Sequence, residues 1–141
     1  METTIQVKDI MTKDVITLKE TDSLELAEKL FAKHQIRHLP VVKNGELIGM
    51  VSKTDLMRIS FLDSLSDTES TIDEAIYQMF SVEQLMIKNI QTVSLFASLK
   101  EVTELFILKE FHALPVVVDK KLVGILTTTD LLKYFITQCE C

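Results

Sequence analysis

The stretch Leu39-Pro40-Val41-Val42 recurs as Leu114-Pro115-Val116-Val117, seventy-five positions further along the 141-residue chain. Shifting the sequence by that interval aligns residues 7–60 with residues 82–135 without a gap, and seventeen of the fifty-four aligned pairs are identical. Both prolines and two of the three glycines fall on equivalent positions. Because proline and glycine constrain the backbone more than other residues do, their shared register indicates one fold copied twice.

The hydrophobic pattern of each copy predicts, in order, a strand, a helix, two strands and a second helix. In the first copy a short strand around residues 15–17 precedes Asp22-Ser23, which is typical of a helix start. The apolar residues that follow recur at helical spacing and give one buried face; they are Leu24, Ala27, Leu30 and Phe31. In the second copy Ser98-x-x-Glu101 has the spacing of a capping box, and a matching apolar stripe follows it.

Two runs rich in β-branched residues come next, at 39–42 and 47–51. Asn44-Gly45 between them favours a tight hairpin, because such a turn needs positive φ angles, and Asp119-Lys120 holds the same place in the second copy. The final helix is expected to begin near Thr54 and at the matching position of the other copy. We therefore predict an α/β fold in which each copy has the order strand, helix, strand, strand, helix.

The pattern divides the chain into three segments. The first repeat is expected at residues 7–62, a polar linker with a connecting helix at 63–81, and the second repeat at 82–138. The connecting helix is indicated by one apolar stripe made of Ile72, Ala75, Ile76, Met79 and Phe80. Because an isolated repeat of about 55 residues would be marginally stable, we expect the two copies to share a core.

The composition argues against several classes of function. The formal net charge is −6, and basic residues are scattered singly apart from Lys120-Lys121, whereas nucleic-acid-binding proteins cluster them. No apolar run approaches the length of a membrane span, and the N-terminus lacks the pattern of a signal peptide. Cys139 and Cys141 are too close together to staple a fold. We expect a cytoplasmic protein that binds neither nucleic acid nor membrane.

Residues 49–55, Gly-Met-Val-Ser-Lys-Thr-Asp, form the most specific chemical pattern and are matched by residues 124–130. A strand ends, a hydroxyl residue follows, and an aspartate lies three residues later at the start of a helix. One interpretation is a helix capping box. The other is a nucleotide site, because a helix N-terminus attracts phosphate and a carboxylate one turn along can accept both hydroxyls of a ribose. The glycine leaves room for a ligand or for another backbone segment.

The sequence resembles a tandem pair of CBS domains, the cystathionine-β-synthase-type repeat. The resemblance rests on the Leu-Pro-Val-Val strand, on the Gly-x-x-[Ser/Thr]-x-x-Asp-Leu segment and on the order of the elements, and it covers nearly all of both copies. It implies that the two repeats pack with pseudo-twofold symmetry into one module. It also implies two clefts between the repeats that hold adenosine-containing ligands, namely AMP, ADP, ATP or S-adenosylmethionine. These are regulatory ligands and not catalytic cofactors.

The resemblance also implies which residues contact the ligand. They come from the first strand, from the entry to the proline-containing strand and from the start of the last helix of each copy. The first copy contributes Thr17, Ile36, Arg37, His38, Pro40, Ser52, Lys53 and Asp55, and the second contributes Thr92, Phe111, His112, Pro115, Thr127 and Asp130.

Each of these positions has an implied role. Asp55 and Asp130 hold the ribose hydroxyls, and the hydroxyl residue three positions earlier faces ribose or phosphate. Backbone groups around Thr17 and Thr92 line the adenine, while the stretches that lead into the two prolines form the cleft wall. Since Arg37, His38 and Lys53 belong to the first copy only, we expect the surroundings of the first motif to favour phosphates.

We therefore predict a regulatory module that is not an enzyme and that signals through an effector protein or through its own homodimer. The dimer is indicated by the apolar helix residues 131–136. Two alternatives remain open: a structural dimerisation module with relic clefts that bind nothing, and a redox- or metal-responsive protein that uses Cys139 and Cys141. His34 and His38 have the i, i+4 spacing of a zinc site, but they are not expected to share a helix.

Overall fold

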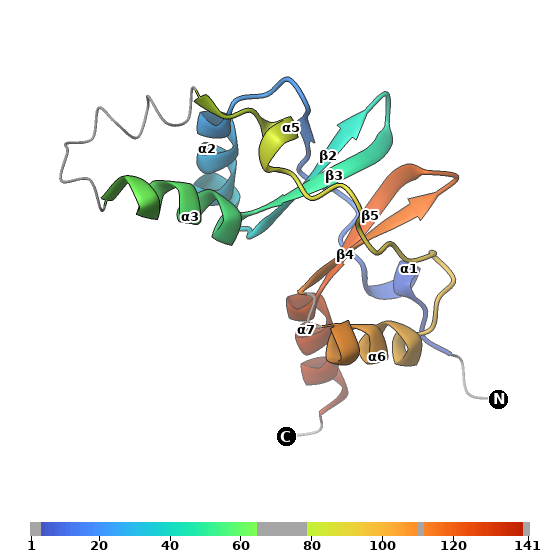
Figure 1. The fold of residues 1–141 in the computed structure, drawn as a ribbon. Coiled ribbons are helices and arrows are strands. Elements are labelled where there is room, and N and C mark those ends of the chain that lie inside the picture. Colours follow the sequence, from blue (N-terminus) through green and yellow to red (C-terminus); the bar gives the residue numbers. More distant parts are fainter. Residues whose placement is uncertain (1–3, 65–78, 110–111, 140–141) are drawn as a thin grey trace. The chain divides into compact units, whose positions relative to one another are not determined.

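The computed structural model describes residues 4–64, 79–109 and 112–139. This part of the chain forms six helices and five strands (Figure 1). In chain order they are α1 (Val7–Ile10), β1 (Leu18–Lys19), α2 (Leu24–His34), β2 (His38–Lys43), β3 (Glu46–Ser52), α3 (Lys53–Ser64), α5 (Val82–Leu85), α6 (Leu99–Lys109), β4 (Ala113–Val118), β5 (Lys121–Thr127) and α7 (Thr128–Gln138). None of these helices combines the length and the apolar character required to cross a membrane.

The chain divides into two compact units that do not follow the order of the sequence. The central unit is Ile16–Ile90, and the terminal unit combines Met1–Val15 with Gln91–Cys141. Helices and strands occur together in both units, which confirms the predicted α/β class. Each unit takes most of its elements from one repeat and one short helix from the segment that begins the other repeat.

In the central unit, β2 pairs with β3 in antiparallel fashion and β1 runs parallel to β2. The predicted hairpin turn is confirmed, since Asn44 has φ 54° and Gly45 has φ 81°. The predicted start of α2 is confirmed as well, because Ser23 Oγ accepts a hydrogen bond from the backbone N–H of Leu26 at 3.1 Å. Both signals are local, so the sequence specifies them without knowledge of the rest of the fold.

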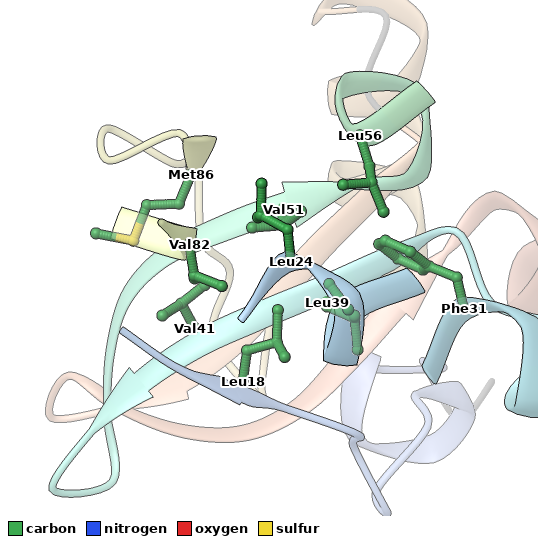
Figure 2. Packing of buried hydrophobic residues seen from close by; sticks show 10 residues of the cluster. Leu18, Leu24, Phe31, Leu39, Val41, Val51, Leu56, Val82 and Met86 are labelled. Carbon is green, nitrogen blue, oxygen red and sulfur yellow. The ribbon is translucent and has the colours of Figure 1, made fainter. Parts of the chain in front are cut away.

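The core of the central unit draws on all of its described elements (Figure 2). Leu24, Ala27 and Phe31 are the buried residues of α2, and Leu30 packs partly buried against the same cluster, so the predicted apolar face is confirmed. The other buried residues come from the strands, α3 and α5; they are Leu18, Leu39, Val41, Val51, Leu56, Val82 and Met86. Burying these side chains together fixes the strands and the helices α2, α3 and α5 of this unit relative to one another.

The terminal unit repeats this arrangement with different residues. β4 pairs with β5 in antiparallel fashion, and a parallel bridge from Val93 to Val116 takes the place that β1 holds beside β2. The hairpin turn is made by two non-glycine residues with positive φ, Asp119 (49°) and Lys120 (70°). The buried core of this unit consists of Val7, Val93, Val102, Phe106, Leu114, Val116 and Leu126.

Each of the two motif glycines allows a segment from the other repeat to pack closely. A Cβ on Gly49 would lie 2.5 Å from Met86 Sδ, and a Cβ on Gly124 would lie 2.6 Å from Met11 Sδ and 3.0 Å from the carbonyl oxygen of Thr12. The backbone groups of Ile87 and Met50 exchange two hydrogen bonds beside this contact, at 3.0 and 2.9 Å. At each motif glycine, the group that packs in place of a side chain is therefore a segment of the protein itself, from the other repeat.

The structure differs from the sequence expectations at two element boundaries. The first strand begins at Leu18 and not at residues 15–17, because Leu18 is the first residue to pair with β2, opposite Val41. α3 continues to Ser64, so Asp63, which we assigned to the linker, is helical. Most of the linker and connecting helix lies outside the described residues; Met79 and Phe80, at its end, are exposed.

Gly49→Ala and Gly124→Ala should each lower the free energy of unfolding by about 1–3 kcal/mol, because the added methyl overpacks a close contact. At Gly49 every nearby atom belongs to the flexible side chain of Met86. The double variant Gly49→Ala/Met86→Ala should therefore lose less stability than the sum of the single variants in urea unfolding. At Gly124 the Thr12 carbonyl remains in the way, so Met11→Ala should relieve less of the cost. Additive effects at both glycines would contradict this packing.

Candidate functional site

In the central unit, three chain segments named by the sequence analysis meet at one edge. His38, the first residue of β2, is paired with Ser52, the last residue of β3. The backbone N–H of Lys53 donates to the carbonyl oxygen of Arg37 at 2.8 Å. Thr17 immediately precedes β1, which runs parallel to β2, so it lies towards the same end of the sheet. We call this edge, with the first turn of α3, the central site.

The terminal unit builds an equivalent edge, which we call the terminal site. Ala113 is paired with Thr127, and the backbone N–H of Thr128 donates to the carbonyl oxygen of His112 at 3.1 Å. Thr92 precedes Val93, whose backbone N–H donates to the Pro115 carbonyl and whose carbonyl oxygen accepts from the Val117 N–H. Within each unit the structure thus brings the described candidate residues to one end of the sheet; Phe111 lies outside the described residues.

At both sites the hydroxyl residue caps the following helix. Ser52 Oγ accepts a hydrogen bond from the backbone N–H of Asp55 at 3.1 Å, and Thr127 Oγ1 does the same for Asp130 at 3.1 Å. At the terminal site the box is complete, since Asp130 Oδ2 accepts from the backbone N–H of Thr127 at 3.0 Å. The capping interpretation of these residues is therefore confirmed.

Capping does not use all the hydrogen-bonding capacity of these side chains. A hydroxyl that accepts a hydrogen bond still has its own proton to donate, and a carboxylate has about four acceptor positions. Ser52, Thr127, Asp55 and Asp130 are all only partly buried. The two hydroxyls can therefore donate to a ligand oxygen, and the two carboxylates can accept from ligand hydroxyls, while the helix caps stay in place.

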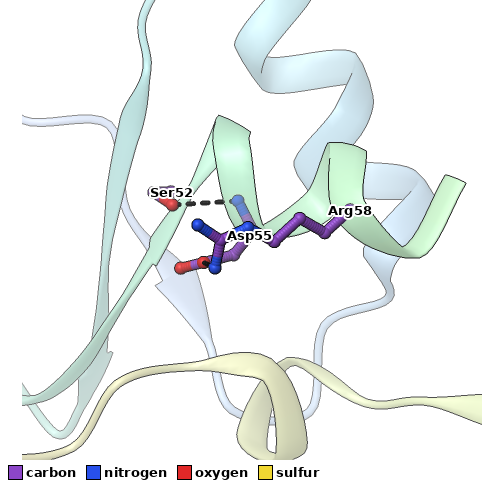
Figure 3. A network of polar contacts seen from close by, with 3 residues as sticks. All are labelled: Ser52, Asp55 and Arg58. Atoms are coloured by element: carbon purple, nitrogen blue, oxygen red, sulfur yellow. Dashed lines mark hydrogen bonds and ion pairs between the residues drawn. The ribbon is translucent and has the colours of Figure 1, made fainter. Parts of the chain in front are cut away.

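The two carboxylates have different neighbours among the described residues. The side chain of Arg58 folds back along α3, and its Nη1 lies 3.5 Å from Asp55 Oδ1 (Figure 3). That ion pair is weak, because the Arg58 side chain is 75% exposed. Asp130 instead accepts from the hydroxyl of Thr12, whose Oγ1 lies 3.2 Å from Oδ1 and 3.4 Å from Oδ2.

The remaining candidate residues differ in how much surface they present. Arg37, Lys53 and His112 are exposed at the edges just described, whereas the side chains of Pro40 and Pro115 are buried in the sheets. Ile36 packs partly buried against the central core. A proline here shapes the strand from within the fold, while the exposed side chains of Arg37 and Lys53 supply positive charge at the surface of the central unit.

The histidines and the cysteine of the alternative hypotheses lie at or beside the ends of secondary-structure elements. His34 is the last residue of α2 and His38 is the first residue of β2, with Gln35 in a left-handed conformation (φ 53°) after the helix. The two histidines therefore do not share a helix face. Among the described residues, no group of three or more potential ligands from His, Cys, Asp and Glu lies close enough to hold a metal ion. Cys139 is a free, exposed thiol.

The sequence analysis missed three residues that surround these sites: Met11, Met86 and Thr12. Met11 and Met86 are equivalent in the repeat, and each lies against the glycine of the other repeat's motif. That repeated identity was a usable signal. Thr12 gave none, because its equivalent is Ile87 and its contact with Asp130 spans 118 positions of sequence.

Comparison with known proteins defines the class to which these two units belong. The family model of the CBS domain matches residues 7–61 and 82–137, which is most of the chain. The chain therefore belongs to the CBS domain family, as two repeats. CBS domain pairs are generally regulatory modules, although some matched relatives carry enzyme names, such as homoserine O-acetyltransferase.

Solved structures of CBS domain pairs are similar to the chain over nearly its whole length. The crystal structure of CBSX2 in complex with AMP is 27% identical, covers 94% of this chain and 96% of its own, and gives a TM-score of 0.78. The CBS domain pair of protein MJ0100, in complex with 5′-methylthioadenosine and S-adenosyl-L-methionine, is also 27% identical with a TM-score of 0.78, covering 97% and 100%.

Curated relatives include longer proteins. The uncharacterized protein MJ1225 of Methanocaldococcus jannaschii is 28% identical over 130 residues, which cover 92% of this chain and 46% of MJ1225. The chain thus spans less than half the length of the first curated relatives that it matches.

Ser52→Ala and Thr127→Ala should each lower the free energy of unfolding by about 1 kcal/mol, because each removes the side-chain acceptor at a helix N-cap. Thr129→Ala is the matched control, since that hydroxyl is exposed in the first turn of α7 and occupies no capping position. Chemical unfolding of the full chain measures all three. Equal stability of Thr127→Ala and Thr129→Ala would contradict the capping role.

Proposed function

We propose that the chain is a regulatory module that binds adenine nucleotides or adenosyl derivatives at the central and terminal sites. The observation that carries this proposal is the repeated placement of a hydroxyl and a carboxylate, each with unused hydrogen-bonding capacity, at the start of a helix in each unit. The AMP held by CBSX2 and the adenosyl ligands held by the MJ0100 pair support it.

Each residue has a stated role in this proposal. Asp55 and Asp130 accept hydrogen bonds from the two ribose hydroxyls, and Ser52 and Thr127 donate to ribose or phosphate oxygens. The positive end of the helix dipole favours negative charge at the same place. Backbone groups beside Thr17 and Thr92, together with the strand entries at 36–40 and 111–115, line the adenine and the cleft wall.

The two sites should differ in their preference for phosphate. Arg37 and Lys53 are exposed beside Ser52, whereas the equivalent positions in the terminal unit are His112 and Thr128. Cations close to the phosphate positions favour charged ligands such as AMP, ADP and ATP. The terminal site is better suited to ligands with less negative charge, such as S-adenosylmethionine.

Asp55→Ala and Asp130→Ala should each weaken binding at its own site by about 1.5–3 kcal/mol, or about ten- to a hundredfold, because hydrogen bonds from two hydroxyls to a carboxylate are lost. The melting temperature should fall only slightly, since the N-cap hydroxyl remains. Calorimetric titration with AMP and with S-adenosylmethionine, beside melting curves without ligand, measures both quantities. If the double variant binds as the wild type does, the ribose role is wrong and only the caps remain.

The output of the module requires a partner, for which we propose a second copy of the chain and an effector protein. α7 has no buried residue, and Leu132, Phe135 and Ile136 are 63%, 65% and 70% exposed. These three residues are spaced i, i+3 and i+4, so they form one apolar stripe on the helix. An exposed apolar stripe of this kind is typical of an interface. A structural dimerisation module would share this surface, but it would not bind ligand.

The wild-type chain should sediment as a dimer at micromolar concentration, and Phe135→Glu should shift it towards monomer, because a charge would be buried in an apolar interface. Lys133→Glu is the matched control, since Lys133 is an exposed residue of α7 outside the apolar stripe. Analytical ultracentrifugation distinguishes these outcomes. A monomeric wild type would exclude the dimer without affecting the ligand sites.

A further inference from the structure

The hydroxyl of Thr12 lies where a ribose is expected to bind. Its Oγ1 is 3.2 Å from one oxygen of the Asp130 carboxylate and 3.4 Å from the other, so it donates to both from a nearly equidistant position. The two hydroxyls of a ribose require the same two oxygens as acceptors. In the terminal unit, the protein's own Thr12 hydroxyl is thus bound to the Asp130 carboxylate, which is expected to hold the ribose of the ligand.

The backbone of Thr12 is fixed, but its side chain is not buried. The N–H of Thr12 donates to the Ile125 carbonyl at 2.9 Å, and the N–H of Ile125 donates back at 3.0 Å. Gly124 admits the preceding residue, Met11, against the strand. The side chain of Thr12 is exposed, so its hydroxyl can rotate into water without disturbing this pairing.

The central unit lacks this hydroxyl, although its backbone is built in the same way. Ile87 is equivalent to Thr12 and exchanges the same two backbone hydrogen bonds, here with Met50. Its side chain has no donor and is 55% exposed. At this backbone position the two units therefore differ only in the side chain, on a shared pattern of backbone hydrogen bonds.

We propose that the Thr12 hydroxyl competes with the ligand for the Asp130 carboxylate and makes the terminal site the weaker of the two. This inference rests on the proposed function. While the Thr12 hydroxyl is bound, the Asp130 carboxylate cannot offer all of its acceptor positions to a ligand. The apparent affinity for the ligand therefore falls in proportion to the fraction of chains in which the carboxylate is not bound to Thr12. Thr12 is thereby a residue that sets the affinity of this site.

The experiment measures the affinity of the terminal site alone. It uses the full chain carrying Asp55→Ala, titrated with AMP in a calorimeter. Thr12→Val removes the hydroxyl and keeps the β-branched shape, so AMP should bind about two- to tenfold more tightly. Thr12→Ser keeps the hydroxyl and should bind as the parent does. Thr12→Ile serves as a second variant, because isoleucine already occupies the equivalent backbone position at residue 87.

The reciprocal variant is made in the full chain carrying Asp130→Ala, where the affinity of the central site for AMP is measured. Ile87→Thr should install a competing hydroxyl near Asp55 and weaken AMP binding there.

Two results would overturn the inference. The first is that the Thr12→Val or Thr12→Ile variant binds AMP no more tightly than the parent, since Thr12 would then be neutral or would position the carboxylate. The second is that the terminal site binds no AMP in any Thr12 variant although the wild type binds AMP. A wild type that binds neither AMP nor S-adenosylmethionine would overturn the proposed function, and this inference with it.

Discussion

The pairing of each sheet with a short segment from the other repeat is the contact on which the rest of the structure depends. Thr12 exchanges two backbone hydrogen bonds with Ile125, and Ile87 does so with Met50. Both pairings need a glycine beside them, because a methionine side chain lies where a Cβ would be. They also explain why the compact units do not coincide with the sequence repeats, since α1 and α5, which precede the paired segments, belong to the unit of the other repeat.

The helix cap and the proposed ligand site use the same side chains without excluding each other. In a cap the hydroxyl oxygen accepts from a backbone N–H, which leaves its own proton to donate. The carboxylate of Asp130 accepts from one backbone N–H through Oδ2 and from the hydroxyl of Thr12, and a carboxylate with about four acceptor positions has others left for a ligand. A cap with both partners in place also holds hydroxyl and carboxylate in fixed positions before a ligand arrives, so less conformational entropy is lost on binding.

Much of this fold could be predicted from the sequence because its signals are local. The N-cap at Ser23, the Asn44-Gly45 turn and the apolar stripe of α2 each depend on a few neighbouring residues, and the internal repeat doubled the evidence for each. The start of β1 was placed too early, because strand pairing with Val41, and not local propensity, sets it. The exchange of segments between the units could not be predicted, since no local pattern records which sheet a short helix will join. Thr12 was missed for the same reason.

The duplication itself explains why the two sites can differ while the two folds do not. Positions that hold the backbone in place are shared: the glycines at 49 and 124, the methionines at 86 and 11, and the prolines at 40 and 115. Positions whose side chains reach the surface near the carboxylates have diverged, with Lys53 matched by Thr128 and Ile87 by Thr12. A change at an exposed position has little effect on stability, because it alters neither packing nor backbone hydrogen bonds. At residue 12 such a change lies 3.2 Å from the Asp130 carboxylate, for which we propose a role in ribose binding, so that a single hydroxyl there would alter affinity. Two copies of one fold can in this way acquire unequal ligand affinities without loss of the scaffold that both require.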